Sequence, residues 1–321
     1  MAKLSIGADL GGTFIKFGYL DAQGKPSNTF QLPTPLDQGA EGVIDQIVTG
    51  VKRLMDHHGL PVEDIAGVGI GAPGPLSISE GVIHAMPNIA GMENVPLRDE
   101  VARRTGLPAV LENDANAAAF GEFLCGAGAG TRDMVLLTLG TGVGGGIVID
   151  GKILHGSHEI GAELGHMIID PGGLECGCGQ KGCLERYCSA TFLGRIAARR
   201  VRESDTPTRL QAVLDAQKIL TAKDILDAAK AGDRLAAEVW SRGAYHLAIG
   251  CVNICRIFDP EIIVLAGGMT KAGDGLLNPL KEHFQQQRWK LTEERTRIVI
   301  GTLGNDAGAV GAAGVARQAF A

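Results

Sequence analysis

Residues 4–20 read LSIGADLGGTFIKFGYL, two apolar runs joined by the turn Asp9-Leu-Gly-Gly-Thr13. Both runs have the composition of strands, and a short glycine turn between two strands predicts a hairpin. Residues 134–154 repeat this plan with the strand MVLLTL, the loop Gly140 to Gly146 and the hairpin IVIDGKIL. Two halves of the chain therefore begin with the same strand, glycine loop and strand.

Helices and strands alternate after each of these beginnings. In the first half the apolar pattern predicts helices at 42–58, 97–105 and 115–124 and strands at 65–71 and 109–113. In the second half it predicts a capped helix from Thr221, a long helix at 233–258, strands at 261–266 and 297–300 and a final helix at 307–320. This order predicts an α/β fold in which mixed sheets are flanked by helices.

The bulk composition limits the classes of function. A chain of 321 residues exceeds the usual size of one core, so we expect two lobes, with a boundary near residues 114–130. A net charge of -6 argues against binding to nucleic acid or to an anionic membrane surface. The N-terminus lacks a signal-like leader and no apolar run reaches the ~18 residues that span a bilayer, so we expect a cytoplasmic protein.

The glycine loops have two interpretations. The spacing Gly140-x-Gly142-x-x-Gly145 fits a dinucleotide-binding loop, but a strand follows it where that motif requires a helix, which disfavours a dehydrogenase. Successive N–H groups in a tight glycine turn can instead bind a phosphate. The first loop adds the Asp9 carboxylate and the Thr13 hydroxyl, which can hold hydrated Mg²⁺ and a phosphate oxygen.

The window from Glu163 to Glu185 carries an imidazole and three thiols. Buried core thiols are the alternative interpretation, but the glycines between the cysteines favour a tight metal knuckle. The four residues form a Cys₃His set, which is typical of a closed structural Zn²⁺ site, and they are His166, Cys176, Cys178 and Cys183. If His166 binds zinc through one ring nitrogen, its other nitrogen is left for a ligand. Seven cysteines in this arrangement fit a reducing compartment.

Asn113 and Asp114 end a predicted strand and precede a helix. Asp114 can be a plain N-cap, and the same position suits a carboxylate that accepts a proton from a hydroxyl group. Four other histidines, His57, His58, His155 and His158, are expected at the surface.

Taken together, these motifs resemble the sugar kinases of the ROK (repressor, open reading frame, kinase) family, in the actin and hexokinase-like ATPase superfamily. The resemblance runs from Ile6 to the C-terminal helix. It implies two ribonuclease H-like lobes with ATP and sugar bound in a cleft between them. The implied N-terminal lobe is 1–118 joined by 307–321, and the C-terminal lobe is 119–306 with the zinc-binding loop.

The resemblance also implies roles for individual residues. ATP phosphates would be bound by Asp9, Gly11, Gly12, Thr13, Gly140, Thr141, Gly142 and Gly144, with an adenosine motif at Gly267 and Gly268 and a magnesium role for Asp9 taken from the wider superfamily. Asp114 would be the general base. The sugar would be bound by Asn88, Asn113, Asp114, Glu163, His166 and Glu185.

The implied reaction is ATP-dependent phosphorylation of a hexose, foremost glucose at its 6-hydroxyl. The family's glucokinases commonly have Trp where this chain has Met92, which leaves N-acetylmannosamine, N-acetylglucosamine and fructose as alternative acceptors. The family also includes sugar-responsive regulators with an N-terminal helix-turn-helix. Here the first strand begins at Leu4, so we do not expect DNA binding. The family's usual homodimer is expected.

Overall fold

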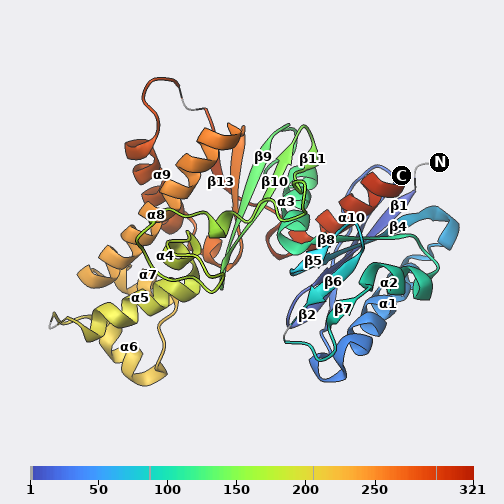
Figure 1. The fold of residues 1–321 in the computed structure, drawn as a ribbon, viewed down its shortest axis with the longest axis horizontal. Helices are drawn as coiled ribbons and strands as arrows, with labels where there is room; N and C mark the ends of the chain where they lie inside the picture. Colours follow the sequence, from blue (N-terminus) through green and yellow to red (C-terminus); the bar gives the residue numbers. More distant parts are fainter. Residues whose placement is uncertain (1–2, 87, 205, 294) are drawn as a thin grey trace. The chain divides into compact units, whose positions relative to one another are not determined.

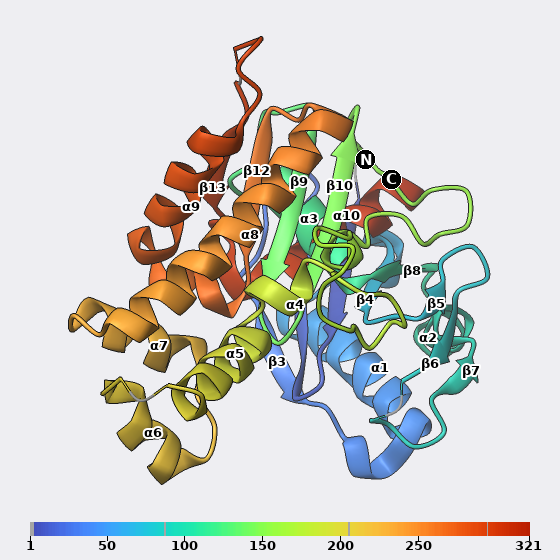
Figure 2. The same ribbon diagram turned by 60° about the vertical axis from the view of Figure 1, so that its left-hand side comes forward.

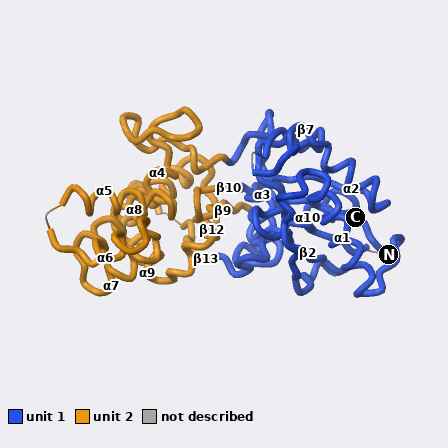
Figure 3. Tube along the Cα trace, turned by 90° about the horizontal axis from the view of Figure 1, so that it is seen from below, with its two compact units in different colours: residues 1–132, 146–162, 301–321 blue, residues 133–145, 163–300 orange. Residues whose placement is uncertain are grey.

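The computed structural model describes residues 3–86, 88–204, 206–293 and 295–321. The chain forms two compact units, drawn in blue and orange in Figure 3. Unit 1 contains residues 1–132, 146–162 and 301–321, and unit 2 contains residues 133–145 and 163–300. The lobe boundaries expected from the sequence stay a prediction.

Unit 1 is built on a five-stranded sheet in the order β3-β2-β1-β4-β8. Its strands are β1 (Leu4–Leu10), β2 (Phe14–Leu20), β3 (Phe30–Pro33), β4 (Ile65–Ala72) and β8 (Ala109–Asn113). The glycine turn makes β1 and β2 an antiparallel hairpin, whereas β1 pairs with β4 and β4 pairs with β8 in parallel. The sheet is therefore mixed, as the sequence predicts.

Helices cover both faces of this sheet (Figure 1). On one face, α1 (Gly39–His58) and α2 (Leu97–Thr105) bury apolar side chains against Ile6, Ala8 and Leu10. On the other face, α10 (Ala307–Phe320) packs on β1 and β4 beside α3 (Asp114–Cys125). A Cβ at Gly7 would lie 2.0 Å from the Ala309 carbonyl oxygen, so α10 approaches the sheet almost backbone to backbone. A small antiparallel sheet of β5 (Leu76–Ser77), β6 (Val82–Ala85) and β7 (Glu93–Val95) also lies in this unit.

The second five-stranded sheet has the order β11-β10-β9-β12-β13. Its strands are β9 (Met134–Leu139), β10 (Val143–Ile149), β11 (Lys152–Ile153), β12 (Ile262–Ala266) and β13 (Arg297–Ile300), and β9, β12 and β13 are parallel. Strand β10 begins at Val143, inside the loop expected at 140–146, so the turn that precedes it is shorter than predicted.

Unit 2 carries the remaining helices: α4 (Glu185–Cys188), α5 (Ala190–Arg202), α6 (Arg209–Gln217), α7 (Ala222–Lys230), α8 (Arg234–Phe258) and α9 (Asp274–Gln287). The predicted capping box is present at Thr221 and Asp224. Asp233 caps the long helix α8, which packs beside α9 (Figure 2). None of the helices that the structure describes combines the length and apolar character needed to cross a membrane.

Short 3-10 turns complete the chain at Leu36–Gln38 (η1), Val62–Asp64 (η2), Leu164–His166 (η3), Gly268–Ala272 (η4) and Gly304–Asp306 (η5). Two of them, η3 and η4, belong to segments that carry predicted site residues.

Candidate functional site

Parallel pairing brings several predicted site residues to one edge of the unit 1 sheet. The register aligns Asp9 on β1 with Gly71 on β4, and Ala72 with Asn113 on β8. These positions are at the carboxyl ends of the three strands, where ligands bind in open α/β sheets. Asp9 and the Asn113-Asp114 pair are therefore neighbours in unit 1.

Asn113, not Asp114, is the N-cap of α3. Its Oδ1 accepts hydrogen bonds from Ala115 N at 2.9 Å and Asn116 N at 3.2 Å. Asp114 is the first helical residue, and its Oδ1 accepts from Ala115 N at 2.8 Å. This corrects the interpretation of Asp114 as a cap and starts the helix one residue earlier than expected.

The electrostatic environment of the two aspartates favours their neutral forms. Burial raises the pKa of Asp9 to about 7, the Asp114 carboxylate adds to the rise and Lys16 opposes it. Burial also raises the pKa of Asp114, and its hydrogen bond from the Ala115 backbone acts in the other direction. Both carboxyls are thus stronger bases than an exposed aspartate.

The first glycine loop keeps its tip exposed. The Gly11 N–H donates to the Phe14 carbonyl at 3.1 Å, which closes the turn, while Gly12 and Thr13 are exposed to solvent. The backbone around the turn is therefore held in place, and the two tip residues are accessible to a ligand.

Asn88 is exposed on a turn of unit 1. Met92, four residues later, is fully buried in the core of this unit, and its carbonyl oxygen accepts from Met86 N at 2.9 Å. The side chain at position 92 therefore fills the core behind this turn.

In unit 2 the second glycine loop connects β9 to β10. The Gly140 N–H donates to the Gly142 carbonyl at 3.0 Å, and Gly144 N donates to Thr138 Oγ1 at 3.0 Å. Glu185 Oε2 accepts from Val143 N at 3.0 Å. A Cβ at position 142 would lie 2.3 Å from that carboxylate oxygen, so glycine is required for this contact.

Gly267 and Gly268 follow β12, which pairs with β9. A Cβ at Gly267 would lie 2.6 Å from the Leu139 carbonyl oxygen, which places this glycine directly beside the start of the second loop. Gly267 has a positive φ of 88°, a conformation that glycine adopts without strain. Gly268 is exposed.

A cavity of about 510 Å³ opens beside Thr141. It lies between α5 and the segment 218–222, and its polar and charged lining includes Thr191, Arg195, Arg202 and Lys218. The sequence pattern indicates no ligand site here, because these residues belong to no glycine motif, and Arg202 is interpreted as part of a solvated basic face or an oligomer contact.

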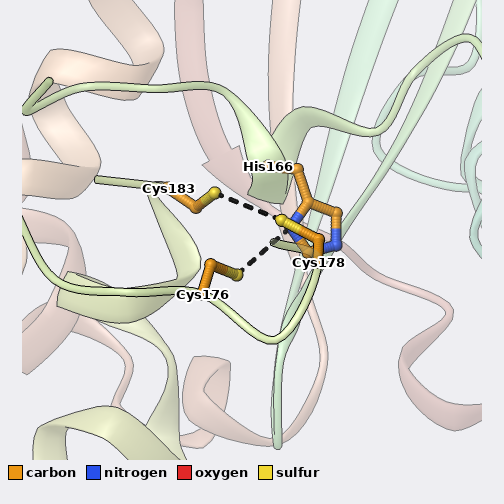
Figure 4. Close-up of side chains that lie close together, drawn as sticks. All are labelled: His166, Cys176, Cys178 and Cys183. Atoms are coloured by element: carbon orange, nitrogen blue, oxygen red, sulfur yellow. Dashed lines mark hydrogen bonds between the residues drawn. The ribbon is translucent and has the colours of Figure 1, made fainter. Parts of the chain in front are cut away.

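The four predicted metal ligands converge, as Figure 4 shows. Their ligand atoms all lie within 4.8 Å of one another. Cys176 Sγ lies 3.6 Å from His166 Nδ1, and Cys178 Sγ lies 3.7 Å from Cys183 Sγ. Around tetrahedral zinc, with Zn–S near 2.3 Å and Zn–N near 2.0 Å, these separations are about 3.5 Å and about 3.8 Å. The residues fit a zinc ion, with Nδ1 as the histidine ligand.

Two segments that adjoin this cluster contact the second glycine loop. His166 ends η3, and a Cβ on its neighbour Gly165 would lie 1.9 Å from the Val143 carbonyl oxygen. Glu185 follows Cys183 by two residues and begins α4. Ala190 N, just beyond α4, donates to the Gly140 carbonyl at 2.9 Å. Glu163, which precedes η3, is exposed.

Sequence reasoning missed a close contact between the imidazole of His155 and the buried carboxylate of Glu112, two residues before Asp114. Glu112 is 1% exposed and its Oε2 lies 2.7 Å from His155 Nε2. The hydrogen bond with Glu112 raises the pKa of His155, while burial acts against the rise. His155 is thus half-buried, contrary to the surface placement expected, whereas His57, His58 and His158 are exposed. The partners are 43 residues apart in the chain, and no local pattern connects them.

The chain is similar to known proteins over nearly its whole length. The model of the ROK family matches residues 5–319. A glucokinase from Halalkalibacterium halodurans is 41% identical over 315 residues, which are 98% of this chain and 94% of that protein. A ROK family glucokinase from Streptomyces griseus, solved in complex with glucose and AMPPNP, is 38% identical with a TM-score of 0.77 over 98% of this chain and 99% of that one. A ROK hexokinase from Thermus thermophilus is 34% identical with a TM-score of 0.84 over 97% and 96%.

Proposed function

Since the chain belongs to the ROK family, we propose that it is a sugar kinase that transfers the γ-phosphoryl group of ATP to the 6-hydroxyl of glucose. The observation that carries this proposal is the similarity, over 98% of the chain, to the S. griseus glucokinase solved with glucose and AMPPNP. The mixed α/β fold is common to this chain and to that family's solved sugar kinases.

We assign the general base to Asp114. In this role its carboxylate accepts the proton of the sugar hydroxyl as the oxygen attacks the γ-phosphorus and ADP leaves with the bridging oxygen. Burial raises its pKa above that of an exposed aspartate, which makes the carboxylate a stronger base. Its place in the first turn of α3 favours the ionised form that starts the reaction.

The sugar contacts follow from the same proposal. We assign the hydroxyl groups of the hexose to Asn88, Asn113, Glu163, His166 and Glu185, since carboxylate, amide and imidazole groups can match hydroxyls that both donate and accept. Because His166 offers Nδ1 to the Cys₃His cluster, its Nε2 is the nitrogen for the sugar. Glu185 uses Oε2 on the Val143 N–H, so we assign its Oε1 to the sugar.

In this proposal the nucleotide phosphates bind to the loops at 9–13 and 140–144, in which Gly12, Thr13 and Thr141 are exposed. We assign the adenosine to Gly267, Gly268 and the cavity beside Thr141, whose volume of about 510 Å³ suits a small-molecule site. Arg195 and Lys218 on that cavity add positive charge for an anionic nucleotide.

The proposed function includes two metal ions, Mg²⁺ and Zn²⁺. Asp9 would hold Mg²⁺, which neutralises charge on the transferring phosphates when it is bound. His166, Cys176, Cys178 and Cys183 would hold a structural Zn²⁺, since four protein ligands leave no open position for catalysis. None of the seven cysteines, all of which lie in the described residues, forms a disulfide, which fits a reducing compartment, so we propose the cytoplasm as the location, and a homodimer as the assembly.

A coupled assay for ADP release tests the proposal. Purified protein with MgATP is offered glucose, mannose, fructose, N-acetylglucosamine and N-acetylmannosamine, and we expect the highest kcat/KM with glucose. A higher kcat/KM with an N-acetylated hexosamine would move the acceptor to that class. If no sugar leads to ADP release, the proposal that the protein is a sugar kinase is wrong.

Asp114→Asn tests the base. We expect kcat to fall by about 10³-fold or more, because a single positioned base contributes about 10²–10⁴-fold. Glucose affinity measured by calorimetry should change less than about threefold. Asp56→Asn, an exposed aspartate on α1, is the matched control and should keep the wild-type rate. Wild-type turnover by Asp114→Asn would remove this residue from the mechanism.

A further inference from the structure

Glu112, the residue before Asn113 on β8, is a buried carboxylate with a 1% exposed side chain. A charge in such a place is strongly unfavourable unless it is paired and hydrogen-bonded. Both of its oxygens have partners. Oε1 accepts from Asn113 N at 2.9 Å and from Asn116 Nδ2 at 3.0 Å, and Oε2 contacts His155 Nε2 at 2.7 Å.

Two of these partners, Asn113 and Asn116, flank Asp114 in the sequence. Asn113 precedes it, and the Asn113 side chain caps α3 by accepting from Ala115 N and Asn116 N. Asn116 follows it by two residues and is tied to Glu112 through its side-chain amide. The Glu112 carboxylate therefore fixes the backbone before Asp114 and the helical turn after it, which together set the direction of the Asp114 side chain.

His155 reaches Glu112 from a firmly held loop of unit 1. The His155 carbonyl accepts from Gly161 N at 2.8 Å, which closes residues 155–161 into a loop. Within this loop, the Glu159 carboxylate accepts from Ser77 Oγ, Ile78 N and Ser79 N, at 3.1, 2.8 and 2.9 Å. The loop that carries the His155 imidazole is therefore held by its own backbone hydrogen bond and by the Glu159 carboxylate.

We propose that His155, acting through Glu112, is a positioning residue that holds Asn113 and Asp114 in the orientation required for proton transfer from the sugar. This inference rests on the proposed function of Asp114. In this role His155 itself touches neither the sugar nor the phosphate. It supplies an N–H and a positive charge to the Glu112 carboxylate, which would otherwise be buried without a counter-charge next to Asn113.

The charged groups around the Glu112–His155 pair determine the effect of removing His155. Glu112 and Glu159 face His155, and Asp9 faces Asp114 with Lys16 nearby. Without the imidazolium, Oε2 of the Glu112 anion loses its partner, and rotation of the carboxylate away from its present position withdraws the Oε1 acceptor that Asn113 N and Asn116 Nδ2 share. As long as Glu112 stays charged, it also makes ionisation of Asp114 less favourable.

Steady-state kinetics of four variants test the proposal. His155→Ala should lower kcat with glucose by about 10- to 100-fold, the size of effect expected when a reacting group is misplaced by about 1 Å. The KM for MgATP should stay within about twofold. His155→Gln, which keeps an N–H donor, should recover kcat to within about fivefold of wild type, and Glu112→Ala, which removes the shared acceptor, should resemble His155→Ala. His158→Ala, an exposed histidine on the same loop, should behave like wild type.

The pH profile of kcat separates positioning from a merely structural role. In His155→Ala the acidic limb should move to higher pH, because an uncompensated Glu112 charge disfavours the ionised form of Asp114. Circular dichroism and urea unfolding report the folded fraction of each variant, and kcat is expressed per folded molecule. If His155→Ala does not fold, His155→Gln carries the test, with its rate kept and its acidic limb moved upward.

A kcat for His155→Ala within twofold of wild type, or an acidic limb that does not move, would overturn the inference. So would a His155→Gln variant as slow as His155→Ala. Such results with a wild-type enzyme that phosphorylates glucose leave the proposed function intact. A wild-type enzyme without activity on any sugar would instead overturn the proposed function itself.

Discussion

Gly308, in the first turn of α10, leaves the space that the Asp9 carboxylate occupies. A Cβ at this position would lie 2.3 Å from Asp9 Oδ2 and 2.9 Å from Oδ1. Because these atoms end a side chain that can rotate, an added methyl group would turn the carboxylate rather than unfold the helix. The glycine thus protects the orientation of a proposed magnesium ligand.

Gly308→Ala should therefore impair function more than stability. We expect kcat/KM for MgATP to fall by about 10- to 100-fold, since a reacting or metal-binding group displaced by about 1 Å can cost that much. The melting temperature should change by only a few degrees. Gly172→Ala, where an added Cβ has open space, is the matched control. Normal kinetics in Gly308→Ala would show that Asp9 tolerates the methyl group.

The residue types of the site could be predicted from the sequence, but their partners could not. Asn and Asp are both favoured N-caps, so the pair Asn113-Asp114 does not reveal which of them caps the helix. The bond between Glu112 and His155 joins residues 43 positions apart. Local spacing carries no information on such a contact, which the folded backbone alone creates.

At the scale of elements, periodicity and caps predicted most of the regular structure. The β1–β2 hairpin follows from the glycine turn, and α8 begins after Asp233, whose side chain accepts from Ala236 N. Helix α9 was missed because it contains Pro279, which usually ends a helix. The strands β5 to β7 were missed because they have two to four residues each, too few to show a period.

The segment from His166 to Cys183, called the zinc knuckle below, carries the predicted zinc ligands. Residues at both of its ends support the second glycine loop, in addition to the sugar contacts proposed for His166 and Glu185. Gly165 packs against Val143, Glu185 accepts from Val143 N, and Ala190 N donates to Gly140 O. These contacts come from both ends of the segment that carries the four predicted metal ligands. We infer that order in the knuckle is transmitted to the proposed phosphate loop.

Zinc removal should therefore weaken nucleotide binding. After chelation we expect the Kd for AMPPNP, measured by calorimetry, to rise about tenfold, which corresponds to about 1.4 kcal/mol. Added zinc should restore it. Cys176→Ser should reproduce the loss, and Cys125→Ser, a free thiol in unit 1, should not. Less than about half an equivalent of zinc in protein purified without chelator would count against the site, and an unchanged Kd would count against the coupling.

At the scale of the whole molecule, the chain passes between its two units at 132/133, 145/146, 162/163 and 300/301. The repeated strand and loop pattern predicted two similar halves. It could not predict that residues 146–162 return to unit 1, because that assignment depends on contacts such as the one between Glu159 and residues 77–79. His155 reaches Glu112 as a result of this return.

Two histidines give the stability of the chain opposite dependences on pH. The pKa of His155 is raised by its hydrogen bond with Glu112, so its stabilisation is fully present below the unfolded value of about 6.5 and is lost as pH rises through the raised value. Burial lowers the pKa of His246 to about 4, so stability decreases as pH falls from about 6.5 toward 4. Asp9, with its pKa raised to about 7 by burial, also loses stabilisation as pH rises to that value.

Above pH 6.5 the His246 contribution is constant, and His155 and Asp9 act in the same direction. In magnesium-free buffer the free energy of urea unfolding should therefore fall between pH 6.5 and 8. His155→Gln removes one titrating group, so the difference in stability between wild type and this variant should shrink as pH rises. His158→Gln is the control, because this histidine is exposed. A stability difference that stays constant or grows over this range would mean that His155 does not carry the charge that its contact with Glu112 requires.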